Sequence, residues 1–111
     1  AREIPGPAPA PSELPEHEKL VLLAICRRLK KDPEITTGDA EQLYKVVCEE
    51  FETKPRSHTT FWKHLKSLEN RSLIDSRMAT AKAGRGRTQY LTMTDTLPSS
   101  IEARLENALR R

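Results

Sequence analysis

The feature that most constrains the fold is an unbroken apolar run at residues 20–26, inside the segment "PEHEKLVLLAICRRLKKD". Pro15 suits a first helical turn, acidic residues follow it, and basic residues close the segment, as the dipole of a helix prefers. Because the run is apolar nearly all round, such a helix has to be covered on every side. We therefore predict a central helix on which the other elements pack.

Two further helices are expected after the short extended piece "EITT" and the break "TKPRS". The segment "GDAEQLYKVVCEEF" has apolar residues at three- and four-residue spacing, and Thr37 is predicted to cap it. The segment "HTTFWKHLKSLEN", capped by Ser57, has two distinct faces when it is drawn as a helix. The apolar face consists of Phe61, Leu65 and Leu68, and the opposite face consists of Thr59, Lys63, Lys66 and Asn70.

The second half of the chain predicts a hairpin and a last helix. "SLIDSRMAT" and "RTQYLTMT" suit strands, and "AKAGRG" between them supplies the glycines of a tight reversal. "LPSSIEARLENALRR" predicts a terminal helix with a capping box formed by Ser99 and Glu102. Three helices followed by a hairpin are typical of a winged helix, an α+β variant of the helix-turn-helix.

A chain of 111 residues, 36% hydrophobic and 32% charged, has the size of one small domain. The stretch "IPGPAPAPSELP" has five prolines in twelve residues, which favours an extended spacer. We expect residues 1–13 to be a proline-rich linker and residues 14–111 to be the winged-helix domain. No run of about 18 apolar residues and no signal-peptide pattern is present, so a soluble, non-exported chain is expected. The initial alanine hints at a fragment of a longer protein.

The two cysteines, Cys26 and Cys48, lie in apolar helical patterns and have no CxxC partner. They are too few for a zinc site or a disulfide scaffold, so we interpret them as core residues of an intracellular protein, with a disulfide between them left open. The chain also lacks the GxxxxGK[ST], HExxH and GxSxG motifs. We therefore expect no enzymatic activity, cofactor or metal in this chain.

Charge is unevenly distributed along the sequence. Residues 1–52 carry 7 basic and 11 acidic side chains, whereas residues 53–92 carry 9 basic and 2 acidic ones. A basic block in one part of a small domain indicates a surface that faces a polyanion. The alternative is that the acidic helices screen it.

Two groups of residues are candidates for DNA contact. At the predicted hairpin tip, Arg85 and Arg87 flank Gly86, a pattern that suits a narrow minor groove, and Lys82 suits a flanking phosphate. On the third helix the candidates are Ser57, His58, Thr59, Thr60, Lys63 and Lys66. The plainer interpretations are a charged turn and a solvated helix face. Trp62 is interpreted as packing at the edge of the core, and His58 and His64 as partly packed histidines.

Four stretches carry a more specific resemblance: "LPEHEKLVLLAI", "ITTGDAEQLYKVVCEEF", "SHTTFWKHLKSLENRSLIDSR" and "GRGRTQYLTM". Over residues 14–94 the chain resembles the C-terminal winged-helix domain of archaeal replication initiators related to the origin recognition complex and the Cdc-type loader. The resemblance implies an upstream ATP-binding AAA+ module and binding of duplex origin DNA, with the recognition helix in the major groove and an arginine-bearing wing in the minor groove. It implies site residues at Ser57, His58, Thr59, Thr60 and Lys63 on the helix and at Lys82, Arg85, Gly86 and Arg87 on the wing.

Three positions depart from the family's pattern. Arginine is frequent in the family where this chain has Thr59 and Thr60, and a glycine is usual where it has Ser72. The predicted wing also lacks an aromatic residue between its glycines. These departures predict binding that rests more on phosphates than on base sequence.

Two other functions fit the same elements. A transcription regulator of this fold would usually dimerise on a palindromic site, whereas we expect this domain to be a monomer. A protein-interaction domain would dock a replicative helicase or the AAA+ module through the first or last helix. For the favoured hypothesis, origin DNA is the main partner and the location is the cytoplasm, in association with the nucleoid.

Overall fold

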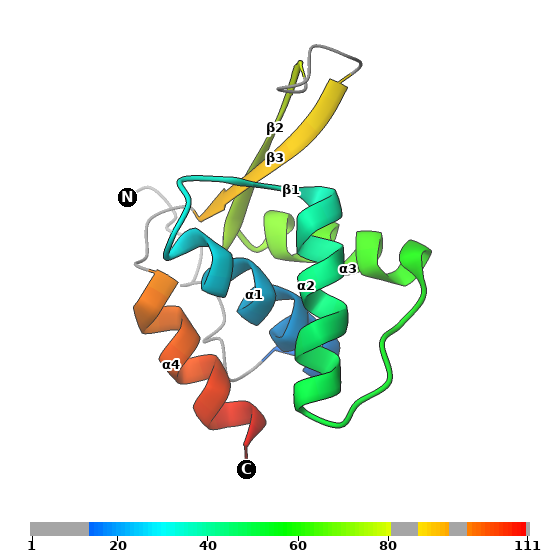
Figure 1. Cartoon of the computed structure of the whole chain (residues 1–111), viewed down its shortest axis with the longest axis vertical. Helices are drawn as coiled ribbons and strands as arrows, with labels where there is room; N and C mark the ends of the chain where they lie inside the picture. Colours follow the sequence, from blue (N-terminus) through cyan, green and yellow to red (C-terminus); the bar gives the residue numbers. More distant parts are fainter. Residues whose placement is uncertain (1–13, 81–86, 94–97, 111) are drawn as a thin grey trace, which may run out of the picture.

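A computed structural model describes residues 14–80, 87–93 and 98–110. Figure 1 shows helices gathered around α1 and a long hairpin that projects away from them. The order of elements confirms the predicted winged helix. The elements are α1 (Glu16–Leu29), β1 (Ile35–Thr36), α2 (Thr37–Glu50), α3 (His58–Asn70), β2 (Ile74–Thr80), β3 (Arg87–Met93) and α4 (Pro98–Leu109).

Helix α1 is the centre of the core, as its sequence predicts. Every residue from 20 to 26 is fully buried. Helices α2, α3 and α4 and strand β3 each contact α1, so all its sides are covered within this small domain (Figure 1). Burying one large apolar side chain contributes about 1.5–3 kcal/mol, so this run is a principal source of stability.

The three strands form one antiparallel sheet in the order β1-β3-β2. Ile74 pairs with Met93 at the base of the hairpin, and Thr80 pairs with Arg87 at its far end. The short strand β1 pairs Ile35 with Leu91, which joins the start of α2 to the base of the hairpin. The hairpin is therefore anchored at one end only, as a wing is.

Two predicted helix starts are wrong, that of α2 by one residue and that of α4 by two. The cap of α2 is Thr36 and not Thr37, because the Thr36 hydroxyl accepts a hydrogen bond from the backbone N–H of Asp39 at 3.0 Å. The predicted capping box of Ser99 and Glu102 does not form, because α4 already begins at Pro98. Proline suits a first helical position, since the N–H that it lacks has no partner there.

Two helices end in a left-handed residue that is not glycine. Ser72, just after α3, has φ 64°, and Glu52, just after α2, has φ 55°. After α3, the N–H of Leu73 donates to the carbonyl of Leu68 and the N–H of Ser72 donates to that of Glu69. This pair of bonds is a Schellman motif, so Ser72 occupies the position that glycine usually takes.

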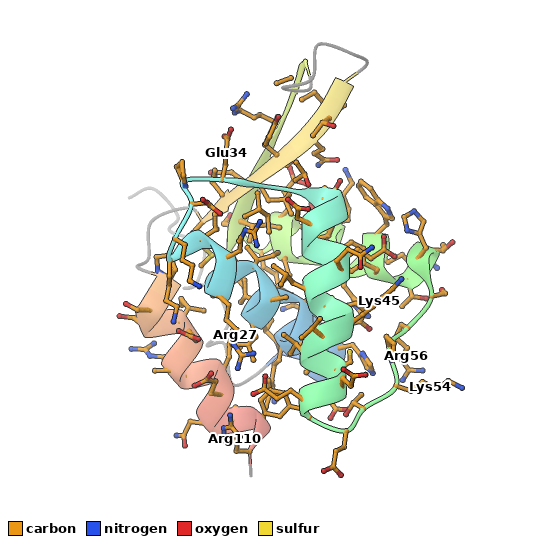
Figure 2. The ribbon with its side chains drawn as sticks, in the orientation of Figure 1. Arg27, Glu34, Lys45, Lys54, Arg56 and Arg110 are labelled. Carbon is orange, nitrogen blue, oxygen red and sulfur yellow. The ribbon has the colours of Figure 1, made fainter. Side chains whose placement is uncertain are left out.

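Ion pairs fasten α4 to the core. Arg27 of α1 donates to Glu50 at 2.6 and 3.1 Å and to Glu106 of α4 at 2.8 Å. Arg110 also pairs with Glu50 and lies over the ring of Phe51 (Figure 2). Because Arg27 is only 25% exposed, its bonds are screened less than those of a surface pair.

Both cysteines are free and buried, so the question of a disulfide is answered: Cys26 and Cys48 are core residues. Burial raises the pKa of the Cys26 thiol to about 12, which keeps it protonated and unreactive. Within the described residues, none of the helices has the length and apolar character needed to cross a membrane.

We predict that Ser72→Gly is more stable than Ser72→Ala by about 1 kcal/mol in the free energy of unfolding, because alanine is strained at positive φ. Urea denaturation measures the difference, and both variants lack the serine hydroxyl. Gln42, exposed within α2, is the control, since alanine should be the more stable replacement there. Equal stability of the two Ser72 variants would contradict the assignment.

Candidate nucleic-acid interface

Helix α3 has the two faces that its sequence predicts. Phe61, Leu65 and Leu68 are buried. Thr59, Lys63, Lys66 and Asn70 are exposed on the other side. Within the part of the chain that the structure describes, neither Lys63 nor Lys66 forms an ion pair. The helix therefore presents to solvent two lysines that form no ion pair with a described residue.

Two surface hollows follow this face. The first, of about 360 Å³, lies between α3 and Gln89 of strand β3, so it joins the helix to the wing. The second, of about 460 Å³, lies along the exposed side of α3. The first is lined by Thr59, Trp62, Lys63, Leu65, Lys66, Glu69 and Gln89, and the second by Lys63, Lys66, Ser67, Asn70 and Arg71.

The hydroxyls at the start of α3 already have partners. The Ser57 Oγ caps the helix by accepting from the backbone N–H of Thr60 at 3.3 Å, which confirms the predicted cap. The same oxygen donates to the Thr60 Oγ1 at 3.1 Å. Ser57 and Thr60 therefore shape the start of the helix, whereas Thr59 is exposed with its side chain in the hollow beside the wing.

His58, the first residue of α3, has both ring nitrogens engaged. Trp62 Nε1 donates to His58 Nε2 at 2.9 Å, so that nitrogen is an acceptor. The ring proton therefore lies on Nδ1, which is 2.8 and 2.9 Å from the two carboxylate oxygens of Glu41 on α2. The expectation that His58 is a partly packed histidine is wrong, because its side chain is 67% exposed, and the ring links α3 to α2 by hydrogen bonds.

A second polar cluster holds α3 against the start of α1. The Tyr44 hydroxyl accepts from the backbone N–H of Arg56 and forms a hydrogen bond with His17 Nδ1, each at 2.8 Å. The rings of His17 and His64 stack with centroids 6.2 Å apart. Glu18, nearly buried, lies 3.8 Å from His64 Nδ1. This cluster ties the segment between α2 and α3 to the start of α1, and so helps to orient α3.

Acidic residues neutralise only part of the basic block. Arg71 lies 3.4 Å from Glu18, and Nη2 of Arg77 lies 2.8 Å from both carboxylate oxygens of Glu34. Two other cations of the block, Lys54 and Arg56, form no ion pair with described residues and are labelled beside the segment between α2 and α3 in Figure 2. These two cations therefore have no direct acidic partner among the described residues, and screening by the acidic helices stays an alternative hypothesis.

The hairpin tip is the other half of the predicted site. Lys82, Arg85 and Gly86 lie outside the described residues. Arg87 begins strand β3, and its backbone pairs with Thr80. Strand β2 therefore ends at residue 80 and β3 begins at residue 87, and this pair is at the far end of the described hairpin.

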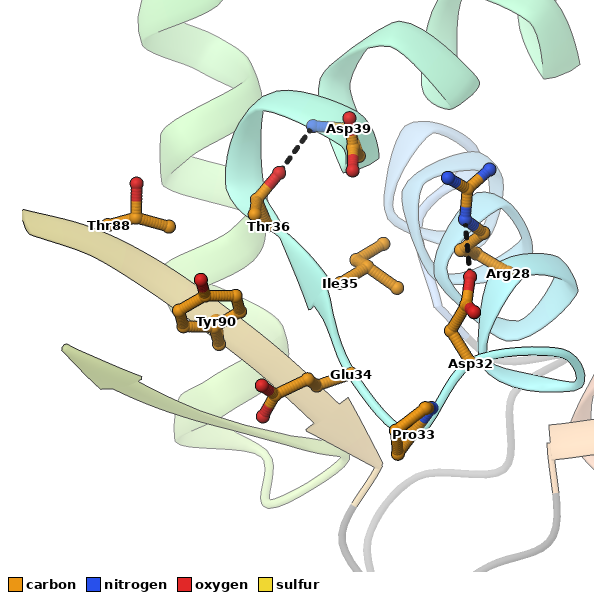
Figure 3. Close-up of a pocket in the computed structure, with 9 residues that line it drawn as sticks. All are labelled: Arg28, Asp32, Pro33, Glu34, Ile35, Thr36, Asp39, Thr88 and Tyr90. Atoms are coloured by element: carbon orange, nitrogen blue, oxygen red, sulfur yellow. Dashed lines mark hydrogen bonds and ion pairs between the residues drawn. The ribbon is translucent and has the colours of Figure 1, made fainter. Parts of the chain in front are cut away.

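A pocket on another part of the surface has the opposite charge. Figure 3 shows it between the end of α1, strand β1 and Tyr90 of β3, with a volume of about 360 Å³. Asp32, Glu34 and Asp39 line it, and Arg28 pairs with Asp32 at 2.9 Å. Its carboxylates disfavour a polyanion, which leaves the α3 face as the candidate for nucleic acid. The described residues hold no group of three or more side chains suited to a metal ion.

Residues 10–99 match the family described as "CDC6, C terminal winged helix domain". The chain belongs to this family. It is 32% identical over 93 residues to the "ORC1-type DNA replication protein 2" of Saccharolobus solfataricus. The aligned region covers 82% of this chain and 22% of that protein. The fold and the resemblance predicted from the sequence are both confirmed.

Solved structures agree with the assignment. Cdc6p from Pyrobaculum aerophilum superimposes with a TM-score of 0.78 at 36% identity, over 89% of this chain and 24% of that one. The ORC1 protein of Aeropyrum pernix, solved in complex with DNA, superimposes with a TM-score of 0.70 at 24% identity and shares the fold. The chain thus spans about a quarter of the length of these relatives and corresponds to their winged-helix domain.

Sequence reasoning missed the link between Glu41, His58 and Trp62. The spacing of four residues between His58 and Trp62 predicts that their side chains are neighbours on a helix. Glu41 lies 17 residues before His58, and only the packing of α2 against α3 brings its carboxylate to the ring. No local pattern points to that pair.

The stability of the domain should fall as the pH is lowered from 7.5 to 5.5. Burial lowers the pKa of His17 and of His64 below 6.5, Arg56 lowers both further, and Glu18 opposes the effect at His64. Both rings are therefore neutral in the folded state, whereas the unfolded chain takes up protons first as the pH falls below about 6.5. Urea denaturation at several pH values measures this loss.

The matched variant is His17→Asn/His64→Asn, which cannot titrate in this range. It should lose clearly less stability than the wild type between pH 7.5 and 5.5. Equal losses in the two proteins would show that other groups cause the pH dependence.

Proposed function

We propose that this domain binds duplex DNA for a replication initiator, with α3 in the major groove and the tip of the β2–β3 hairpin in the neighbouring minor groove. The observation that carries the proposal is the exposed face of α3, where Lys63 and Lys66 form no ion pair with a described residue and line a hollow that continues to the wing. Exposed lysines that form no ion pair are suited to phosphates, which have the complementary charge.

The fold supports this docking mode. A recognition helix presents the residues near its start to the base edges, and an adjacent hairpin follows the backbone. In this domain α3 begins with exposed residues at 57–59, and the wing is anchored beside it through β1 and the base of the hairpin. The Aeropyrum pernix ORC1 protein, which has a similar fold, was solved in complex with DNA.

The proposal extends to the protein from which the domain comes. The relatives are about four times longer than this chain, so we propose that an upstream AAA+ module supplies any ATPase activity and that residues 1–13 link it to the domain. A single small module buries little surface on DNA, so the module upstream would add to the affinity. Origin DNA is the proposed target.

Fluorescence anisotropy with labelled duplex DNA at several salt concentrations tests the proposal. We expect salt-sensitive binding, and each phosphate contact that is lost should reduce the slope of log K against log salt by about 0.9. Lys63→Ala/Lys66→Ala and Arg85→Ala/Arg87→Ala should both weaken binding and flatten this slope.

The charge-matched control is Lys31→Ala/Arg104→Ala, which removes two exposed cations located just after α1 and on α4. It should bind almost as well as the wild type. An equal loss in the control would mean that only net charge matters, and wild-type affinity in both test variants would exclude the proposed surface.

A further inference from the structure

Two aromatic rings stand together in the first two turns of α3. His58 and Trp62 are one helical turn apart, with ring centroids 6.0 Å apart and planes at 74°, an edge-to-face arrangement. Trp62 is one of the few large apolar residues exposed in the described structure, at 37%, and the His58 side chain is 67% exposed. We call this pair the aromatic edge.

The aromatic edge has used its hydrogen-bonding atoms within the protein. An indole has a single donor, and that of Trp62 is bound to His58 Nε2. An imidazole has two ring nitrogens, and the second, Nδ1, is bound to Glu41. What the two rings present to a ligand is therefore carbon, although both are polar residue types.

The surroundings of the aromatic edge indicate a polyanionic ligand. Trp62 lines the same hollow as Lys63, Lys66 and the buried Leu65, so carbon lies next to two cations that form no ion pair with a described residue. Glu69 lines this hollow too, and its carboxylate accepts a hydrogen bond from Ser76 Oγ at 3.0 Å. Glu41, whose carboxylate accepts the hydrogen bond from His58 Nδ1, has a side chain that is only 19% exposed. Apolar surface rimmed by positive charge complements a DNA groove, in which phosphates flank the bases.

In the major groove of DNA the apolar feature is the C5-methyl group of thymine, while the other base edges offer donors and acceptors. Carbon placed against those donors and acceptors would remove their water without replacing its hydrogen bonds, which is unfavourable. We propose that the aromatic edge is a specificity-determining site that selects thymine by contact with its methyl group. The inference rests on the proposed function, because it requires α3 to lie in the major groove.

Glu41 is then a positioning residue for the aromatic edge. Its carboxylate holds the proton of His58 on Nδ1 and leaves Nε2 as the acceptor for Trp62. With Glu41 replaced by alanine, the imidazole is free to turn and to offer an N–H to other base edges. With Glu41→Gln, the amide oxygen still accepts from Nδ1, so the ring pair is retained without the charge.

The test removes the methyl group from the DNA and leaves every hydrogen-bonding atom in place. A preferred duplex site is first selected with the wild-type domain, and each thymine is then replaced by deoxyuridine, one at a time. Burial of one methyl group predicts a loss of about fourfold in affinity at one or two positions and none at the others. Anisotropy titration measures each ratio of dissociation constants.

Protein variants assign the methyl contact to the aromatic edge. At the sensitive positions the thymine-to-deoxyuridine ratio should fall to about one for Trp62→Ala, fall for Glu41→Ala and stay near the wild-type value for Glu41→Gln. Because each ratio compares two DNAs with one protein, the general gain in affinity from removing a carboxylate cancels. The wild-type measurement also stands alone if a variant fails to fold.

Three results would overturn the inference while leaving the proposed function intact. The first is a selected site that contains no thymine. The second is a wild-type affinity that no deoxyuridine replacement changes. The third is a thymine-to-deoxyuridine ratio of dissociation constants that Trp62→Ala leaves unchanged. Failure of the wild-type domain to bind duplex DNA at any salt concentration would overturn both the inference and the proposed function.

Discussion

The structure depends on the burial of residues 20–26 in α1. A helix whose whole circumference is apolar needs partners on all sides, and in a chain of this size nearly every other element has to supply one. Helices α2 and α3 pack on it, β3 lies against it, and α4 covers what remains (Figure 1). The face of α3 that is turned away from α1 is free for a ligand for this reason.

Polar contacts at the edges of this core orient α3. Tyr44 joins the α2–α3 segment to His17, and Glu41 holds the His58 ring at the start of the helix. Burial raises the pKa of Tyr44 to about 12, so its hydroxyl stays protonated at neutral pH. Hydrophobic packing sets the position of α3, and these directional bonds set its rotation, which decides which side chains face outward.

Predictions from local sequence succeeded where the interaction itself is local. The Ser57 cap joins residues three apart, and the two faces of α3 follow from helical periodicity alone. The sequence predicts the cap of α2 one residue late, because the side chains of Thr36 and Thr37 are both able to cap a helix. The choice between them depends on β1, which pairs Thr36 with Tyr90, 54 residues away in sequence.

The sequence by itself determined the element order, the central helix, the winged-helix class, the family and the basic face of α3, because these depend on periodicity, composition and short motifs. Only the tertiary structure decided which cations stay unpaired, that Ser72 takes a left-handed conformation, and that the nitrogens of His58 and Trp62 are occupied. Ion pairs such as Arg77–Glu34 and hydrogen bonds such as His58–Glu41 join residues on different elements. Their formation depends on distances of a few ångströms, which are set when the elements pack.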